Sequence, residues 1–562
     1  MPSAYKMKKA KLHIAFKELK NELLKKEGNR DFWRNSLGLS AAQDSEVIQI
    51  LNELQIPLQY YKAELKRIPE KGPFLVVVNS RHTHWDALML LCLVRLKRPD
   101  FAILNPEDDS LAPDFFKALE SLIPAAETNC TENVANLVSA FERGEGRGFL
   151  MPAKSKRRQV ALKVKRQDEK GILTFLADFR AFEVPILPVY LKNGKPIVEP
   201  NLKSVEQAWS GRVFRRNATI RVARLLYPKE VKSYTEDRHL LALLLQRIGI
   251  LSLSLPQNKK SLFLRKRPLQ AEQVEEEPQL EMLKNEISFL ADKQKLVLSQ
   301  KQFAVYLAEA EDIPYLLKQI GRLREISFRE IGEGSNKALD LDTYDYHYHH
   351  LLLWDQEAEC LVGAYRLAYG PQVFKRFGIN GFYTHSLFKV GSAAYSIFEN
   401  SLELGRAFIV KEYQQKPLPL FILWNAIKAL MDKDKDLQYI LGCASISNRF
   451  SSFSKSLMVS YLLKNHGDAS LASLIKPRKA FKPDVNLLNK KGLWDDIPSD
   501  MVAFDRKLEE IEPGSLRIPP LIKKYIQSQA LVVCFNIDPL FNNSLDGFMY
   551  IRRKDLDLPS QG

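Results

Sequence analysis

The sequence predicts an α/β protein with two such domains in series, because two stretches of the chain each alternate buried strands with helices. In the first stretch, an apolar strand over Phe74–Asn79 leads through a short polar motif into a helix over Ala87–Leu96. In the second, a helical run that begins near Ile313 precedes three apolar strands. A charged segment separates the two stretches, as expected of a connection between domains.

Length and composition fit a folded protein of several domains. A chain of 562 residues exceeds one ordinary core and favours about three or four domains. Its 45% hydrophobic and 10% aromatic residues are typical of globular chains. The net charge of +16 and a pI near 9.3 favour a polyanionic partner: nucleic acid, an anionic membrane surface or an acidic protein. No motif that reads DNA or RNA accompanies the charge, so we expect no nucleic-acid partner.

Cysteine usage and apolar runs bear on the compartment. The five cysteines lie far apart without a C-x-x-C pair, which indicates a reducing compartment and neither a disulfide framework nor a zinc site. The histidines of His347–His350 lack zinc-ligand spacing as well, so we expect no metal. There is no signal-peptide pattern and no apolar run of the ~18 residues that span a bilayer. We therefore expect a cytoplasmic protein that is peripheral on the inner face of the cytoplasmic membrane.

Composition divides the chain into four parts. Residues 1–255 form the first domain, and 256–300 form a charged linker or bridging helix in which a basic stretch gives way to an acidic one. Residues 301–485 form the second domain, and 486–562 form a C-terminal extension that we expect to dock on it.

The first residues carry a basic amphipathic pattern. Over Met7–Lys26, lysines alternate with apolar residues at helical spacing. Such a helix can lie on anionic lipid, and it can equally pack on its own domain as a solvated helix. The sequence leaves both interpretations open.

Three motifs lie at strands of the first domain: Asn79-Ser-Arg-His-Thr-His-Trp-Asp86, Gly148-Phe-Leu-Met-Pro-Ala-Lys-Ser155 and Val184-Pro-Ile-Leu-Pro-Val-Tyr-Leu191. They resemble the motifs of the glycerolipid acyltransferases, which acylate lysophosphatidate and similar hydroxyl acceptors. That family has Asn-His followed four or five residues later by Asp, then Phe-Pro-x-Gly-Glu, then a Val-Pro-Val strand. The resemblance implies an α/β domain with the glycerolipid acyltransferase fold.

The first motif departs from the family at the residue that carries the chemistry. Counting back from Asp86, the expected general-base histidine falls on Ser80 or Arg81, and neither accepts a proton near neutral pH as imidazole does. His82 and His84 lie nearby, one or more residues out of register. We therefore expect a degenerate site in a domain that keeps the fold and has lost acyl transfer.

The second motif is altered too, because Lys154 and Ser155 stand where the family has Gly-Glu. A basic stretch begins at the same point, and it could meet lipid phosphates or an acidic carrier protein, or be a solvated loop. Its charged members are Lys154, Lys156, Arg157, Arg158, Lys163 and Lys165.

The second domain contains a strand with two charges inside it. The apolar residues of Ser401–Val410 predict a short buried strand, yet Glu403 and Arg406 lie within it. Buried charges are costly unless they are paired or used. An ion pair at a strand end and a catalytic pair both explain the pattern.

Further charged positions precede that strand in a defined order. Arg324 and Phe328 lie near the end of the helical run, Asp342 and Asp345 lie in a loop, and Arg366 lies on a later strand. Over roughly residues 300–450 this order resembles the acyl-homoserine-lactone synthases and the hemolysin-like N-acyltransferases that start ornithine- and glycine-type aminolipids. The resemblance implies a GNAT-like mixed α/β fold.

The same resemblance implies roles for these residues. Glu403 would be the general base, acting through water. Arg324, Arg366 and Arg406 would hold the carboxylate of an amino acid or orient the acidic loop, and the two aspartates would hold an ammonium group or position that loop. The acyl group would often be a 3-hydroxy fatty acyl.

The donor is suggested by the turn after the charged strand. CoA-using enzymes of this fold have a Gly-rich turn there, whose N–H groups bind the pyrophosphate. This chain has Pro417 and Pro419 instead, and proline has no N–H to donate. We therefore expect an acyl carrier protein thioester as the donor substrate, with no separate cofactor.

Together these expectations describe an acyltransferase of bacterial aminolipid biosynthesis. It would move a (3-hydroxy)fatty acyl group from acyl carrier protein to the α-amine of an amino acid such as ornithine or glycine. Two alternatives stay open: an O-acyltransferase that acts on a lysolipid hydroxyl through the first domain, and a non-catalytic membrane or carrier-protein adaptor.

Overall fold

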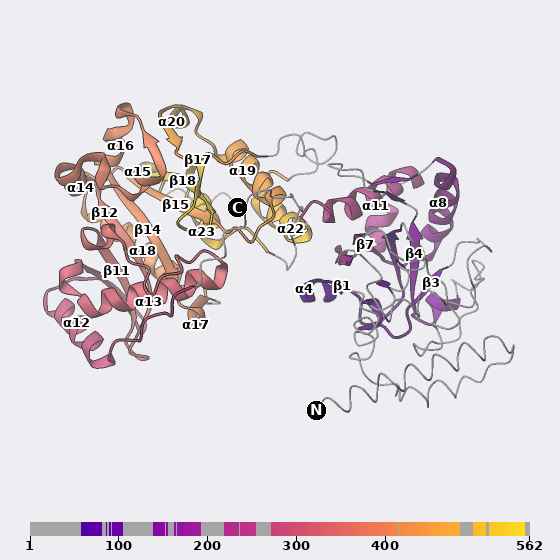
Figure 1. Cartoon of the computed structure of the whole chain (residues 1–562), viewed down its shortest axis with the longest axis horizontal. Coiled ribbons are helices and arrows are strands. Elements are labelled where there is room, and N and C mark those ends of the chain that lie inside the picture. The colour runs from indigo at the N-terminus through magenta and orange to yellow at the C-terminus, as the bar shows by residue number, and fades with distance from the viewer. Residues whose placement is uncertain are drawn as a thin grey trace. The chain divides into compact units, whose positions relative to one another are not determined.

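A computed structural model of the chain falls into two compact units, each of which is considered by itself (Figure 1). Unit 1 consists of Met1–Leu255, Lys490–Asp495 and Glu509–Leu516, and unit 2 of Pro256–Asn489, Asp496–Leu508 and Arg517–Gly562. The structure describes residues 58–80, 86, 89–90, 93–104, 139–151, 153–154, 162–164, 166–192, 218–234, 236–254, 271–414, 416–483, 498–512 and 516–556.

Several sequence expectations lie outside the described residues. They concern the helix expected over Met7–Lys26, the motif residues Arg81, His82 and Ser155, and most of the basic stretch that begins at Lys154. Among the parts that the structure describes, no helix combines the length and apolar character needed to cross a bilayer.

Unit 1 is built on a six-stranded sheet in the order β1-β8-β7-β2-β4-β3. Its pairs are parallel apart from β7 with β8. All six residues of β2 are buried, as its apolar run predicts for a strand covered on both faces. The strands of the unit are β1 (Leu58–Gln59), β2 (Phe74–Asn79), β3 (Ala102–Leu104), β4 (Gly146–Met151), β5 (Ala153–Lys154), β6 (Lys163–Val164), β7 (Ile186–Lys192) and β8 (Ala218–Val222).

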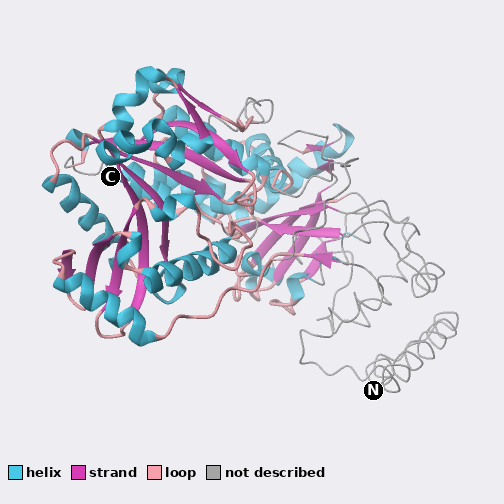
Figure 2. Cartoon of the chain, turned by 60° about the vertical axis from the view of Figure 1, so that its left-hand side comes forward, coloured by secondary structure: helices cyan, strands magenta, loops and turns pink. Residues whose placement is uncertain are grey.

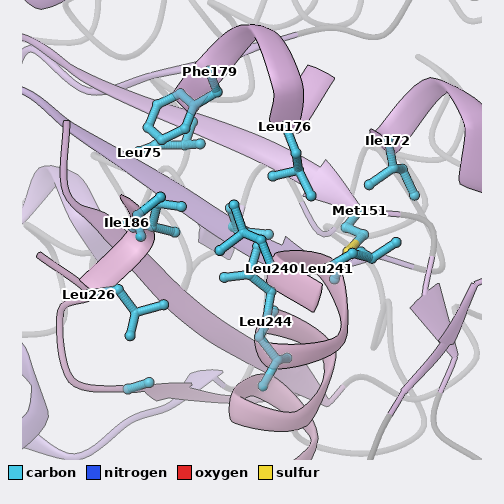
Figure 3. Packing of buried hydrophobic residues seen from close by; sticks show 14 of the residues in the cluster. Leu75, Met151, Ile172, Leu176, Phe179, Ile186, Leu226, Leu240, Leu241 and Leu244 are labelled. Atoms are coloured by element: carbon cyan, nitrogen blue, oxygen red, sulfur yellow. The ribbon is translucent and has the colours of Figure 1, made fainter. Parts of the chain in front are cut away.

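Two helices cover one face of this sheet. Figure 3 shows Leu176 of α8 (Arg166–Phe179) and Leu244 of α11 (Asp237–Leu251) gathered with Ile186 of β7 in one buried cluster. Because side chains alternate along a strand, every second residue of β2 faces this cluster and the others face a second one. The shorter helices of the unit are α4 (Lys62–Leu65) and α10 (Pro228–Lys232).

Unit 2 is built on an eight-stranded sheet in the order β17-β18-β15-β14-β12-β11-β10-β9. Its pairs are antiparallel apart from β14 with β15, which are parallel. The strands are β9 (Leu296–Gln300), β10 (Phe303–Ala308), β11 (His349–Asp355), β12 (Cys360–Tyr369), β14 (Ser401–Ile409), β15 (Tyr439–Ile446), β17 (Leu531–Asp538) and β18 (Ser544–Arg552), and a small separate sheet pairs β13 (Phe388–Val390) with β16 (Ile475–Pro477).

Helices pack along the strands of this sheet (Figure 2). A parallel pair needs a crossover, and α18 (Leu418–Lys433) supplies it between β14 and β15. The remaining helices of this part of the chain are α12 (Leu280–Asp292), α13 (Pro314–Ile331), α14 (Gly370–Phe377), α15 (Tyr383–Leu387), α16 (Tyr395–Glu399), α17 (Lys411–Gln414), α19 (Ser452–His466), α20 (Ala469–Leu474), α22 (Met501–Ile511) and α23 (Pro520–Gln527).

Two segments expected outside the second domain contribute to its sheet and core. Within the expected linker 256–300, α12 buries Leu283 and Leu290 in a core cluster, and β9 forms the edge strand. The two leucines are seven residues apart and so lie on one face of the helix. Within the expected extension 486–562, β18 pairs with both β15 and β17. That segment therefore completes the sheet and is more than a docked tail.

Strands β14 and β15 pair over a short length only. Ser401 to Leu404 of β14 register with Tyr439 to Gly442 of β15, and beyond Leu404 no registered pair joins the two strands. On its other side β14 carries a bulge, because Arg406 and Ala407 lie opposite the single residue Tyr365 of β12. Bulges of this kind re-aim side chains and are frequent beside active sites.

Candidate active site

Glu403 is buried on β14 and is surrounded by hydrogen-bond donors. It is 1% exposed, and its carboxylate accepts hydrogen bonds from the hydroxyl groups of Tyr348 and Thr384. The backbone N–H of Thr384 donates over 2.7 Å and that of Tyr383 over 3.2 Å. These donors satisfy the buried charge without a cation. One of these hydrogen bonds would have to rearrange before either carboxylate oxygen could take a proton.

Arg406 adopts an uncommon backbone conformation at the bulge. Its φ is 49°, a left-handed value that costs free energy for a residue with a side chain. The guanidinium Nε lies 3.4 Å from Asp340 Oδ2, and Nη2 lies 3.7 Å from Asp342 Oδ2. Within the residues that the structure describes, Arg406 forms no ion pair with Glu403. The strand-end pair that the sequence left open is therefore not formed.

Aromatic rings flank the Arg406 guanidinium. Its centre lies 5.0 Å from the Tyr383 ring and 4.8 Å from the Phe541 ring, both within cation–π range. Nη1 donates to the Tyr383 hydroxyl over 3.3 Å. The side chain as a whole is 14% exposed, while its Nε atom is buried and has no hydrogen-bond partner among the described residues.

Arg324, on α13, binds the acidic loop, which is formed by residues 340–345. Its two terminal nitrogens each donate to Asp345 over 3.0 Å, and its Nε lies 2.7 Å from Asp340 Oδ2. Arg324 is 1% exposed. It therefore positions the loop and has no surface left for a substrate.

Arg366, on β12, holds the same loop from the other side. Nη1 donates to Asp342 over 2.6 Å and to Asp345 over 3.0 Å. The central carbon of its guanidinium lies 5.2 to 5.6 Å from the centroids of three aromatic rings, those of Tyr344, Tyr348 and Tyr383. Arg366 is buried and binds the loop through Nη1, while its Nε and Nη2 have no hydrogen-bond partner among the described residues.

Asp345 is the centre of this network. Burial alone would raise the pKa of its carboxyl group, but Arg324 and Arg366 hold that pKa well below its usual range. Asp342 caps the short helical turn Thr343–Tyr346 by accepting from the Tyr344 N–H over 2.9 Å. Two arginines and a helix cap thus fix the acidic loop in one conformation.

Phe328, predicted to bind substrate, lies 8% exposed in a core cluster on α13. Its ring meets the Phe541 ring edge-on at 5.0 Å, and Phe541 lies against Arg406. In this structure Phe328 therefore supports Arg406 through Phe541.

The structure adds residues that the sequence did not single out. Tyr348, Tyr383 and Thr384 donate to Glu403, and Asp340 contacts both Arg324 and Arg406. Asp340 shares the acidic phrase Asp340-Leu-Asp-Thr-Tyr-Asp345, which could have revealed it. The tyrosines and the threonine carry no spacing signal, because they lie in loops and short turns.

Two other side chains of unit 2 carry groups that can react or bind a metal, namely the Cys443 thiol and the His350 imidazole. Burial raises the pKa of the Cys443 thiol well above its ordinary value, so a reactive thiolate is disfavoured. His350 contacts the Asp345 backbone carbonyl through Nε2 over 2.8 Å, and burial lowers its pKa to about 4.

In unit 1, Asp86 has a hydroxyl partner in the altered motif. Ser80 Oγ donates to Asp86 Oδ2 over 3.0 Å, and both residues are buried. Lys154 lies on β5, opposite Lys163 of β6. Arg81, His82 and Ser155 are outside the described residues, so the structure brings together two of the six motif residues.

Comparison with known proteins finds one family model that matches part of unit 2 and two relatives that are similar to part of the chain. The family model of the acetyltransferase (GNAT) domain matches residues 323–424, which contain the acidic loop, Glu403 and Arg406. A glycine N(alpha)-acyltransferase of Phocaeicola vulgatus is 29% identical over 259 residues, covering 44% of this chain and 77% of that protein. One of Bacteroides thetaiotaomicron is 27% identical over 259 residues, covering 44% of this chain and 75% of that protein.

A solved structure is also similar to part of the chain. It is the 1-acyl-sn-glycerophosphate acyltransferase of Thermotoga maritima, at 14% identity and a TM-score of 0.25, covering 41% of this chain and 86% of that one. The matches to the GNAT domain and to the two N-acyltransferases show that the chain is an acyltransferase with a GNAT domain in unit 2.

Proposed function

We propose that unit 2 transfers a fatty acyl group from a carrier thioester to the α-amine of an amino acid, with glycine as the first candidate. Two relatives named glycine N(alpha)-acyltransferase support this acceptor. The observation that carries the proposal is the partly exposed Arg406 side chain, whose Nε has no hydrogen-bond partner among the described residues. It lies beside the buried Glu403 network and beyond the last residue pair of β14 and β15.

Arg406 is the residue proposed to bind the acceptor's carboxylate. The Arg324 and Arg366 guanidinium groups are buried and their ion pairs are directed at Asp345. Arg406 retains exposed surface, and its longer contacts of 3.4 and 3.7 Å to the aspartates leave it able to take a carboxylate. A free α-carboxylate would therefore be part of what the site recognises.

Glu403 is proposed to position the reacting groups. Its four hydrogen bonds fix Tyr348 and the start of α15, and Tyr383 in that turn contacts Arg406. The general-base role expected from the resemblance would require one of those contacts to open. A positioning role requires no change in the hydrogen bonds of Glu403.

An acyl carrier protein is the proposed donor. Pro417 is the N-cap residue of α18, and Pro419 lies in its first turn. Each proline removes one N–H from the helix end that would otherwise bind a pyrophosphate. A phosphopantetheine arm carries a single phosphate on an acidic protein, which the net charge of +16 favours.

The product would be an N-acyl amino acid, an amphiphile that belongs in a membrane. An enzyme with this product would act in aminolipid biosynthesis, peripheral to an anionic membrane surface. Hydroxyl acylation by unit 1 is not proposed, since Ser80 or Arg81 stands where the resembled family has its general-base histidine.

The test uses the purified full chain with 3-hydroxyacyl groups on acyl carrier protein or on CoA, and with glycine or ornithine as acceptor. We expect N-acyl product by mass spectrometry, with kcat/KM at least about tenfold higher for the carrier protein than for CoA. Comparable values for the two donors would contradict the donor assignment. Absence of amide with every donor and acceptor would contradict the function itself. Arg406→Ala serves as the inactive control.

A further inference from the structure

Three buried carboxyl groups lie together in unit 2, outside the acidic loop. Asp538 ends β17, Asp546 lies on β18, and Glu333 follows α13. Glu333 accepts from the Ser445 hydroxyl over 2.7 Å, and Ser445 is the registered partner of Asp546. Asp538 accepts from the Tyr383 hydroxyl over 3.3 Å. We call Glu333, Asp538 and Asp546 the carboxyl cluster.

Strand register places the carboxyl cluster on the same face of the sheet as Glu403. Glu403 pairs with Leu441, and Cys443 and Ser445 follow it on the same face because side chains alternate along β15. Asp546 pairs with Ser445 and therefore shares that face. The carboxyl cluster thus continues the site beyond the point where β14 and β15 stop pairing.

Asp546 lacks the partners that Glu403 has. It is 7% exposed, and its Oδ2 has no hydrogen-bond partner among the described residues. No ion pair within 4.0 Å reaches any member of the carboxyl cluster in the described part of the chain. A buried carboxylate oxygen without a donor is costly, and a bound cation or ammonium group would satisfy it.

The charged groups around Asp546 also favour a bound cation or ammonium group. Burial, then Asp538 and Glu333, raise the pKa of Asp546 to about 8, and Arg406 opposes them. Burial raises the pKa of Glu333 to about 7, although the Ser445 hydrogen bond, Arg406 and Arg449 oppose it. An ammonium group placed among these carboxyls would relieve their mutual repulsion and favour their charged forms.

We propose that the carboxyl cluster binds the ammonium group of the acceptor and that Asp546 accepts the proton which that group must lose. The inference rests on the proposed function, and it assigns the proton acceptor of that reaction to a residue of β18. Arg406 on one side and the carboxyl cluster on the other then match the two charges of an α-amino acid.

Amide formation removes two protons from the nitrogen of the ammonium group. Asp546 takes one proton from the ammonium group, and the freed lone pair on nitrogen attacks the thioester carbonyl carbon. The C–S bond breaks, and the thiolate of the carrier takes the second nitrogen proton. One acyl thioester and one ammonium group thus give one amide, one thiol and one proton, which Asp546 releases to solvent.

The test compares the full chain with Asp546→Asn and with Asp432→Asn, an exposed carboxylate on α18 as the matched control. Amide formation from glycine is followed from about pH 6 to about pH 9. We expect kcat/KM of the parent to rise as pH increases through about 7 to about 8, where the carboxyl cluster ionises. Asp546→Asn should lose ~10²-fold and flatten that rise, since a positioned base typically contributes at least this much. The Asp432 variant should match the parent.

Two outcomes overturn the inference. An Asp546→Asn enzyme with a rate within a few-fold of the parent and an unchanged pH profile would make Asp546 structural. A second measurement does not require the proposed reaction to occur. It compares the stabilisation of the protein against heat by glycine with that by glycolate, which lacks the ammonium group. Above about pH 8 the parent should be stabilised more by glycine, and Asp546→Asn should lose the difference. Equal stabilisation of the parent by both ligands would reject the ammonium site even if amide is formed.

Discussion

The two units each bury an aspartate in a motif that resembles an acyltransferase site, and they surround it differently. In unit 1, Asp86 accepts a hydrogen bond from the Ser80 hydroxyl. In unit 2, Asp345 accepts from the guanidinium groups of Arg324 and Arg366. One aspartate thus accepts a hydrogen bond from a neutral hydroxyl and the other from two cationic side chains, so the two motifs hold their acids by different interactions.

The largest effect is expected from Asp345→Asn. The amide would leave two buried guanidinium groups facing each other, and breaking a buried pair costs roughly 3–5 kcal/mol. The unfolding transition of unit 2 in denaturant should shift by that amount. As a control, Glu330→Gln removes the surface ion pair with Lys411 and should shift the transition far less. Equal shifts for the two variants would show that the buried network does not hold the loop.

Arg406→Lys should weaken the acceptor site without unfolding the unit. Lysine keeps the charge and loses the forked geometry that binds a carboxylate through two hydrogen bonds. The expected loss in kcat/KM for glycine is ~10–10²-fold, mainly through KM. Glycinamide has no carboxylate, so the variant should narrow the preference for glycine over glycinamide. An unchanged preference would remove Arg406 from carboxylate binding.

The carboxyl cluster should make stability depend on pH in a predictable direction. Asp546 has a pKa of about 8 in the folded chain against 3.8 for the free group, so the folded state holds a proton that the unfolded state releases. Stability therefore falls as pH rises from about 4 to about 8. Asp546→Asn removes this loss of stability. The unfolding free energy of the variant minus that of the parent should therefore increase with pH, by at most about 1.4 kcal/mol per pH unit. A difference that does not change with pH would contradict the burial of an ionisable Asp546.

Much of this architecture is predictable from the sequence. The apolar runs of β2, β12 and β14 give their strands, and the order Arg324, Asp342, Asp345, Arg366 places four members of the network. Asp546 is not among the predicted site residues, although it is a charge inside an apolar strand, the same signal that singles out Glu403. Its importance depends on the pairing of β18 with β15, which joins residues about a hundred positions apart and leaves no local pattern.

The bulge at Arg406 and the donors around Glu403 could not be predicted in the same way. Gly405 inside the strand can signal a bulge, but the left-handed φ falls on the next residue, Arg406, a residue type that rarely adopts it. Tyr348 and Thr384 reach Glu403 from segments whose positions depend on tertiary packing. Sequence periodicity therefore gives the strands but not the contacts between loops.

Asp86→Asn should have the smallest effect on amide synthesis. Because unit 1 is not proposed to catalyse acyl transfer, N-acyl product should form at a rate within about twofold of the parent. Ser80→Ala is the matched control, since it removes the other partner of the same hydrogen bond. A product that contains an ester in the parent and loses it with Asp86→Asn would make unit 1 an active O-acyltransferase.

The most direct measurement reads the activities of both units from one reaction. The full chain is incubated with excess 3-hydroxyacyl carrier protein and nitrogen-labelled glycine, and the products are separated before and after mild alkaline hydrolysis, which cleaves esters and leaves amides intact. We predict one product, with a single acyl chain, the label retained and no loss of mass on hydrolysis. A second acyl chain released by alkali would contradict the expected inactivity of unit 1. The absence of any labelled amide would contradict the assignment of N-acyl transfer to unit 2.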